Sequence, residues 1–125
     1  MNAQQTVEAY WQAMQSNDFY LAANCLSADV EILWPQSGER ITGRNNFAEL
    51  NSAYPAEGRW TFVINCIVAD GQQVVTDVTV SDGKRTDTAI TFHTVEQGLI
   101  RRQVEYWPEN YPAPKWRKPW VEYVG

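Results

Sequence analysis

The amino-acid sequence predicts an α+β fold in which helices from the N-terminal part cover one face of a mainly antiparallel sheet. Three observations predict it. Apolar residues follow helical spacing before residue 55, they alternate with polar residues from residue 60 onward, and short turn sequences separate the alternating runs. The 125 residues, of which 44% are hydrophobic, suffice for one core. We therefore expect a single domain over residues 1–125.

Three helices are expected before the sheet. The segment 2–15 has apolar residues at three- and four-residue spacing, which predicts a helix with one buried stripe. A side-chain oxygen of Asn17 or Asp18 can cap a short second helix that runs to Leu26. The run "DVEILW" is typical of a strand, and "PQSGERITG" predicts a turn. A third helix is expected over 44–54, because the following proline disfavours its continuation.

Four strands joined as consecutive hairpins should follow. The turn sequences "ADGQ" and "SDGK" each contain Asp-Gly, which favours a two-residue turn, and "EQG" suits a three-residue loop that ends in a left-handed Gly98. The segments between them have the period of two that strands require. The expected strands are "WTFVINCIVA", "QVVTDVTV", "KRTDTAITFHTV" and "LIRRQVEYW".

Counting outward from these turns assigns each side chain to a face of the sheet. One face is apolar apart from Asp77 and Thr88, and its members are Phe62, Ile64, Cys66, Val75, Ile90, Phe92, Val104 and Tyr106. The other face mixes apolar and polar residues, namely Val63, Asn65, Ile67, Val74, Thr76, Val78, Asp87, Ala89, Thr91, His93, Arg101, Gln103, Glu105 and Trp107. A mixed face of this kind is better explained as the wall of a pocket than as solvent-exposed surface.

Four segments together resemble the nuclear transport factor 2-like (NTF2-like) superfamily, in its SnoaL-like and ketosteroid-isomerase-like branch. They are "VEAYWQAMQSND", "LSADVEILWP", "GERITGRNNF" and "QGLIRRQVEYW". The resemblance implies a cone in which helices cover the concave face of a strongly curved sheet and leave a central apolar pocket. It also implies that the convex face often forms a dimer. Tyr10, eight residues before Asp18, and Trp107 in the last strand match the ketosteroid isomerase pattern.

Two departures from that pattern bear on the chemistry. Trp34 precedes Pro35 at the position where those isomerases carry their proton-shuttling aspartate. Thr91, or Ile90 with a different gap, stands where their oxyanion-stabilising acid lies. Steroid isomerisation by that mechanism is therefore not expected, because neither of these positions offers a carboxyl group.

Glu105 is the leading catalytic candidate, because an apolar surrounding would raise its pKa into the range useful for acid or base work. The alternative is a structural glutamate held by Asn65 or Arg101. The other catalytic candidates are Asp87, His93 and Tyr10. Asp87 could share acid and base roles with Glu105 or lie at a solvated rim, His93 is expected near the rim, and Tyr10 is either a ligand donor or a core residue.

The expected ligand-binding residues are Tyr10, Trp34, Val63, Asn65, Thr76, Val78, Thr91, Gln103 and Trp107. We expect a homodimer through the apolar face, carried by Ile64, Cys66, Val75, Ile90, Phe92 and Val104, which would otherwise be an exposed patch. The aromatic C-terminal tail, residues 108–125, should be extended, with Trp116 and Trp120 packed on the domain or on its dimer mate, and pocket capping as the alternative.

Composition argues against several classes of function. The net charge of −5 offers no electrostatic footprint for nucleic acid or for an anionic membrane, and no segment reads as a signal peptide or a membrane span, so we expect a cytoplasmic protein. Cys25 and Cys66 are expected to be buried free thiols. No metal and no cofactor is expected, since His93 is the only histidine and has no neighbouring ligands.

Two functional hypotheses follow. The first is a small-molecule pocket protein that performs isomerisation, cyclisation or hydration by acid/base chemistry centred on Glu105. The second is a non-catalytic ligand carrier or protein-interaction subunit with the same pocket. Fold resemblance cannot choose between them, since one fold hosts unrelated functions.

Overall fold

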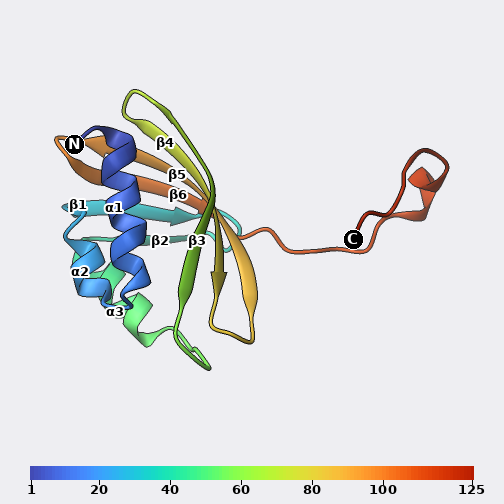
Figure 1. Ribbon diagram of the computed structural model, residues 1–125, viewed down its shortest axis with the longest axis horizontal. Coiled ribbons are helices and arrows are strands. Elements are labelled where there is room, and N and C mark those ends of the chain that lie inside the picture. The colour runs from blue at the N-terminus through green and yellow to red at the C-terminus, as the bar shows by residue number, and fades with distance from the viewer.

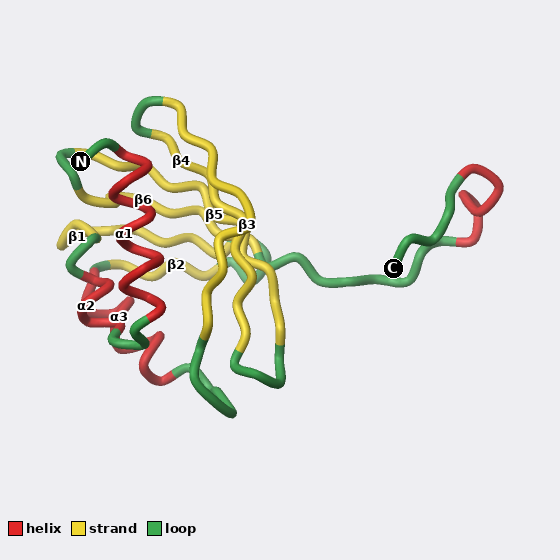
Figure 2. The backbone as a smooth tube through the Cα atoms, viewed as in Figure 1, coloured by secondary structure: helices red, strands yellow, loops and turns green.

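The computed structural model describes residues 1–125 as a curved six-stranded sheet with three α-helices on its concave side (Figure 1, Figure 2). The helices are α1 (Ala3–Gln15), α2 (Phe19–Ala23) and α3 (Arg44–Ala53), with a late 3-10 helix η1 (Lys115–Trp120). The strands are β1 (Leu26–Trp34), β2 (Glu39–Thr42), β3 (Thr61–Asp70), β4 (Gln73–Ser81), β5 (Thr86–Glu96) and β6 (Leu99–Tyr106). The predicted α+β architecture, with helices over the concave face of a curved sheet, is confirmed.

The predicted helix starts depend on side-chain caps. Asn2 accepts a hydrogen bond from the Gln5 amide at 2.8 Å, and the Gln5 side chain accepts one from the Asn2 amide, which forms a capping box for α1. Asp18 caps α2 through the Leu21 amide. The second helix ends at Ala23, earlier than expected, and β1 begins at Leu26, where that helix was expected to end.

The sheet order is β2-β1-β6-β5-β4-β3. The segment that was expected to be only a turn contains strand β2, which pairs with β1 after a turn closed by the Gly38 amide on the Trp34 carbonyl at 2.9 Å. Strand β1 lies parallel to β6, and all other neighbours are antiparallel. This one parallel contact brings the end of β1 beside the end of β6, which matters for the site.

The β4–β5 loop is longer than its Asp-Gly pair predicted. Ser81 pairs with Thr86, so four residues form the loop. Asp82 organises it: its carboxylate accepts hydrogen bonds from the amides of Lys84, Arg85 and, from the preceding α3–β3 loop, Glu57. These amide donors hold the pKa of Asp82 down at about 2.

Replacing Asp82 with alanine should therefore lower the midpoint of thermal unfolding, because three amide donors lose their acceptor. The depressed pKa means that the stabilisation is present above pH 3.8 and is lost as the pH falls toward 2. Differential scanning calorimetry at pH 7 and pH 2.5 measures both effects. Asp70→Ala, at the exposed end of β3, is the matched control, and an equal shift in both variants would contradict this role for Asp82.

A β-bulge in β3 overturns part of the predicted face assignment. The register with β4 shifts between Ile64 and Cys66, and the extra residue reverses the inside and outside of the part of β3 that precedes it. Phe62 and Ile64 consequently pack toward the core, whereas Val63 and Asn65 are exposed. The predictions that Val63 and Asn65 face the pocket, and that Ile64 lies on the apolar outer face, are wrong.

The β5–β6 hairpin also differs in detail. Its loop has two residues, Gln97 and Gly98, both with positive φ, and the expected three-residue loop is wrong. A register shift follows, and Arg101 points outward. Together, the shorter loop and the register shift displace the pairing of β5 with β6 by two residues from the predicted one. A displacement of two residues keeps each side chain on its face, so Glu105 lies opposite Thr91 rather than beside Ala89.

The convex side of the sheet, called the outer face below, carries two rows of residues across β3, β4, β5 and β6. The rows are Val68, Val75, Phe92 and Val104, and beside them Cys66, Asp77, Ile90 and Tyr106. Both cysteines are free, but Cys66 is exposed and Cys25 is half-buried, so the expectation of two buried thiols is wrong. The region called the arm below, residues 108–125, extends away from the domain (Figure 1).

Candidate functional site

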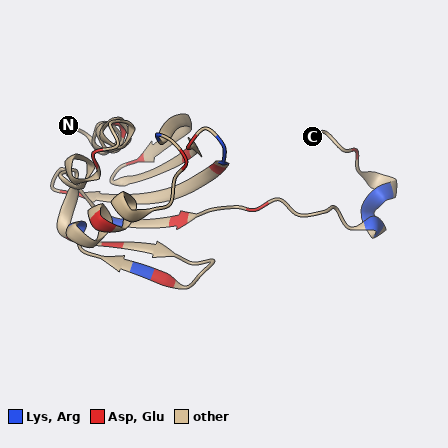
Figure 3. Ribbon diagram, turned by 90° about the horizontal axis from the view of Figure 1, so that it is seen from below, with Lys and Arg blue, Asp and Glu red and all other residues tan.

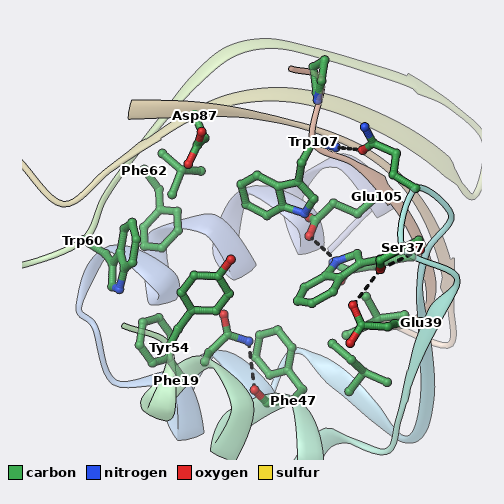
Figure 4. A pocket seen from close by; sticks show the side chains of 18 of the residues that line it. Phe19, Ser37, Glu39, Phe47, Tyr54, Trp60, Phe62, Asp87, Glu105 and Trp107 are labelled. Carbon is green, nitrogen blue, oxygen red and sulfur yellow. Dashed lines mark hydrogen bonds between the residues drawn. The ribbon is translucent and has the colours of Figure 1, made fainter. Parts of the chain in front are cut away.

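A cavity of about 300 Å³ lies between the helices and the concave face of the sheet. Eight of its 21 lining residues are aromatic: Tyr10, Phe19, Trp34, Phe47, Tyr54, Trp60, Phe62 and Trp107. Figure 4 labels six of them, Phe19, Phe47, Tyr54, Trp60, Phe62 and Trp107, and shows them converging on the cavity with the Glu105 carboxyl group among them. Such a site suits a small, largely apolar molecule.

The Glu105 side chain is the buried acid of this cavity. Its Oε1 accepts a hydrogen bond from Trp34 Nε1 at 3.0 Å, and its Oε2 accepts one from Thr91 Oγ1 at 2.6 Å. The Trp107 indole approaches the same carboxyl group from the other side (Figure 4). Burial raises the pKa of Glu105, and the hydrogen bonds from Thr91 and Trp34 offset only part of that effect.

Each partner of Glu105 comes from a different strand. Thr91 lies directly opposite it on β5, and Trp34 lies at the end of β1, whose Leu33 pairs with Val104 of β6. By the resemblance, Trp34 stands at one of the two acid positions of the ketosteroid isomerase pattern, and Thr91, or Ile90 with a different gap, stands at the other. Trp34 and Thr91 both donate a hydrogen bond to Glu105, so the pocket has a carboxyl group of its own in this region.

Beneath the pocket floor, buried polar groups form a chain. The Trp11 indole donates to Thr76 Oγ1 at 3.3 Å, Thr76 contacts His93 Nε2 at 2.8 Å, and His93 Nδ1 contacts Gln103 Nε2 at 3.1 Å. Gln103 lines the cavity and also meets Tyr10, whose pKa is raised chiefly by burial and further by the nearby Glu105. The chain therefore connects the core to the pocket side chains.

His93 is fully buried, and the prediction that it lies near the rim is wrong. Burial lowers its pKa to about 3, so the imidazole is neutral. If Nδ1 accepts from the Gln103 amide, Nε2 must carry the proton and donate to Thr76. His93 orients Gln103 but has no contact with the cavity.

Charged groups gather at the mouth of the cavity. Arg85 Nε donates to Asp87 Oδ2 at 2.6 Å, and both residues line the opening together with the exposed Glu39 and Glu109. Asp87 is part of the pocket surface, as predicted, but it is paired with Arg85 at the solvated edge. No group of three or more histidine, cysteine, aspartate or glutamate side chains is placed to hold a metal ion.

The structure brings most predicted site residues to the cavity or directly behind it. Those that line it are Tyr10, Trp34, Asp87, Gln103, Glu105 and Trp107. Thr76, Val78, Thr91 and His93 are buried behind the lining, and Val63 and Asn65 lie outside. Sequence reasoning missed Phe19 and Phe47, which the buried stripes of their helices could have indicated, and Phe62, for which the bulge left no local signal.

Comparison with known proteins identifies the family. The model of the SnoaL-like domain matches residues 7–103. The chain belongs to the SnoaL-like domain family. No curated protein matches the sequence.

Solved structures agree with membership of the SnoaL-like domain family. A provisionally assigned ketosteroid isomerase from Kribbella flavida DSM 17836 is 30% identical, with a TM-score of 0.90 over 98% of this chain and 90% of that one. An NTF-2 like protein of unknown function from Burkholderia xenovorans LB400 is 28% identical, with a TM-score of 0.80 over 98% and 95%. An LEH-like epoxide hydrolase from M. tuberculosis is 28% identical, with a TM-score of 0.67 over 85% and 82%.

The SnoaL-like match ends at residue 103, before Glu105 and Trp107, whereas the similarity to the Kribbella structure extends over nearly the whole chain and therefore into the arm. The helices are all too short or too polar to cross a membrane. The family match and the similar structures confirm the predicted SnoaL-like, NTF2-like fold, and its cavity contains the buried acid Glu105.

Proposed function

We propose that this SnoaL-like chain is an enzyme that isomerises, cyclises or hydrates a small, mainly apolar molecule by proton transfer at one of the molecule's oxygen atoms. Glu105 is the proton-transferring group, and no cofactor takes part. The observation that carries the proposal is a single buried carboxyl group, with a raised pKa, inside an aromatic cavity of about 300 Å³.

The pKa of Glu105 gives the acid a definite role. Because burial favours the neutral form, Glu105 keeps a proton to higher pH than an ordinary carboxyl group and can donate it to a ligand oxygen. The indoles of Trp34 and Trp107 exclude water and stabilise the carboxylate that remains after donation. Asp87 at the mouth, paired with Arg85, is then the second acid, and the different environments of the two carboxyl groups divide the acid and base roles between them.

The similar structures support this range of reactions. One is a provisionally assigned ketosteroid isomerase and another is an LEH-like epoxide hydrolase. Isomerisation through the isomerase pattern does not fit, because Trp34 and either Thr91 or Ile90 stand where that pattern has its two acids. A reaction in which Glu105 protonates an oxygen needs neither of them, and this favours hydration or ring opening over steroid isomerisation.

A specific observation favours a second candidate, a non-catalytic ligand carrier. Both oxygens of Glu105 already accept hydrogen bonds, from Trp34 and Thr91. A carboxyl group engaged in this way can hold two strands and a tryptophan in place without exchanging a proton with any ligand. In that case the cavity binds its ligand and releases it unchanged.

Turnover assays discriminate between the candidates. The purified protein is incubated with hydrophobic epoxides and with β,γ-unsaturated ketones, and products are followed by gas chromatography and ultraviolet absorbance. We expect diols from one or more epoxides at a rate well above the uncatalysed one. Binding without product, across compounds that fill the cavity, would favour the carrier and contradict the enzyme.

Ligand binding can be tested separately with 2-naphthol, a flat aromatic probe with one hydroxyl group. Trp107→Ala should weaken its binding about tenfold or more, because the indole contributes a large apolar wall of the cavity. Isothermal titration calorimetry measures the dissociation constant. Tyr20→Ala, which removes an exposed aromatic side chain of α2, is the matched control and should bind as the original chain does. Equal affinity in both variants would contradict the assignment of the pocket.

A further inference from the structure

The helices and the concave side of the sheet form the floor of the cavity. The outer face lies on the opposite side of the sheet, and the arm contributes only Pro108 and Glu109 to the lining. Trp116 is 73% exposed and Trp120 is 77% exposed, so the expectation that both tryptophans pack on the domain of their own chain is wrong. The groups that a ligand meets at the floor therefore belong to the helices and the sheet.

No positive charge reaches the floor of the cavity. Arg85 is the only lysine or arginine among the lining residues, and Asp87 holds its guanidinium group at the mouth. Lys115, Arg117 and Lys118 lie in η1, the blue segment of the arm in Figure 3, away from the domain. An anionic group of a ligand would be buried at the floor without a cation, which is costly in free energy. Polar recognition at the floor therefore favours a neutral group.

Gln103 has a buried acceptor oxygen without a partner. The residue is 1% exposed and lines the cavity. Its Nε2 donates to His93 Nδ1 at 3.1 Å, and the same amide group also acts as a donor toward the Tyr10 hydroxyl. No group of the protein donates to its Oε1. Ser27 Oγ is the one fully enclosed side-chain polar atom that lacks a partner, so the Oε1 of Gln103 borders the open space of the cavity.

His93 sets the orientation of this amide from behind the cavity. Because Gln103 donates to His93 Nδ1, the proton of the imidazole lies on Nε2, which donates to Thr76 Oγ1 at 2.8 Å. Thr76 Oγ1 also accepts from the Trp11 indole, a group that can only donate. In this arrangement, turning the amide over would bring Oε1 against the unprotonated Nδ1, and two acceptors repel each other. The carbonyl oxygen is therefore kept toward the cavity.

The Tyr10 hydroxyl supplies a donor beside this acceptor. Burial raises the pKa of Tyr10 well above its ordinary value, so the phenol keeps its proton. Its oxygen faces an N–H of Gln103, which leaves its own O–H free to donate to a ligand. A hydroxyl group of a ligand can accept from Tyr10 and donate to Gln103 at the same time. A carboxylate cannot donate, and an ammonium group cannot accept.

We propose that the Gln103 carbonyl oxygen, with the Tyr10 hydroxyl beside it, binds a second oxygen of the substrate, a hydroxyl group, and that His93 is the positioning residue of this subsite. The inference rests on the proposed function, in which Glu105 binds the reacting oxygen. Glu105 and Gln103 lie two residues apart on one face of β6, about 7 Å along the strand. The substrate class is therefore an apolar molecule that carries a hydroxyl group at about this distance from its reacting oxygen.

Two flat probes test the subsite by isothermal titration calorimetry with the full chain. Naphthalene-2,6-diol differs from 2-naphthol by one hydroxyl group at the far end of the same skeleton, and we expect it to bind about tenfold or more tightly. Gln103→Met keeps the length of the side chain and removes the acceptor, so it should bind the two probes equally within about twofold. Gln12→Met, on the exposed side of α1, is the matched control and should keep the preference for the diol.

Three outcomes would overturn the subsite. They are equal affinities for the two probes in the original chain, no binding of either probe at about 1 mM, and an undiminished preference for the diol in Gln103→Met. The measurement is of binding and needs no turnover. A chain that prefers the diol but forms no product from any substrate would keep the subsite and lose only the enzymatic part of the proposed function.

The positioning role of His93 has its own test. His93→Asn keeps an acceptor close to the place of Nδ1, whereas His93→Leu has none. The ratio of the two dissociation constants should stay within about threefold of the original in His93→Asn and fall to about one in His93→Leu. A general loss of packing weakens both probes alike and leaves this ratio unchanged. A ratio that is kept in both variants, or lost in both, would contradict the positioning role.

Discussion

Replacing Glu105 with glutamine should lower turnover by about 10²–10⁴-fold, the usual loss when a general acid or base is removed. Glutamine keeps the size of the side chain and one acceptor oxygen, so Trp34 or Thr91 retains a partner. Binding of 2-naphthol should consequently change by less than about fivefold. In the original chain, the turnover rate should fall as the pH rises through the raised pKa of Glu105. In the variant, this part of the pH dependence should be absent.

Glu109→Gln is the matched control for this substitution. Glu109 also borders the cavity, but it is exposed and makes no contact with the buried acid. Its replacement should leave turnover within a few-fold of the original. If Glu105→Gln turned over substrate as fast as Glu109→Gln does, proton transfer would have to occur elsewhere in the pocket, and Asp87 would be the next residue to replace.

The second large effect concerns His93 and stability in acid. The folded-state pKa is about 3 and the unfolded value is 6.5, so below pH 6.5 the unfolded chain takes up a proton that the folded chain does not. The free energy of unfolding should therefore fall by about 1.4 kcal/mol per pH unit between 6.5 and 3 from this residue alone. The total, roughly 4–5 kcal/mol, is a large share of the stability of a typical domain.

His93→Gln removes this contribution and leaves the other titrating groups in place. Urea unfolding at several pH values should show that the variant loses less stability than the original chain as the pH falls, although it starts lower at pH 7 because the contacts with Thr76 and Gln103 are altered. The carboxyl groups contribute equally to both curves and cancel in the comparison. Parallel curves from pH 7 to pH 3.5 would mean that His93 titrates normally in the folded state.

The raised pKa of Glu105 has the opposite effect on the pH dependence of stability in the same experiment. A folded-state pKa raised above the unfolded value means that the acid contributes stability below the unfolded pKa and loses that contribution as the pH rises through the folded one. The fall of the free energy of unfolding at low pH therefore reports on His93 and Asp82. Its fall at higher pH reports on Glu105.

Much of the fold could be predicted from local patterns. The first helix and its cap, the short capped second helix and the four alternating strands depend on residues close together in the sequence, such as Asn2 with Gln5 and Asp18 with Leu21. Glu105, Gln103 and Trp107 were assigned correctly to the pocket side, because the period of two survives a displacement of two residues.

The errors arose where one residue changes the phase of a strand. The bulge after Ile64 reversed the first part of β3, so Val63 and Asn65 turned outward and Phe62 became part of the pocket wall. Nothing in "WTFVINCIVA" marks the position of the bulge, because apolar residues occur on both faces there. The burial of His93 was missed for a similar reason, since its depth depends on Tyr10 and Trp11 packing over it from the first helix.

The sequence by itself determined the α+β class, the capped helices and a mixed polar and apolar face that includes Glu105, because these follow from spacing and from contacts between near neighbours. Only the tertiary structure decided what surrounds that acid. Trp34 reaches Glu105 across 71 positions of the chain through the parallel contact of β1 with β6. The pKa of an acid depends on how many apolar groups and donors are packed against it, and that packing is set by strands that are distant in sequence.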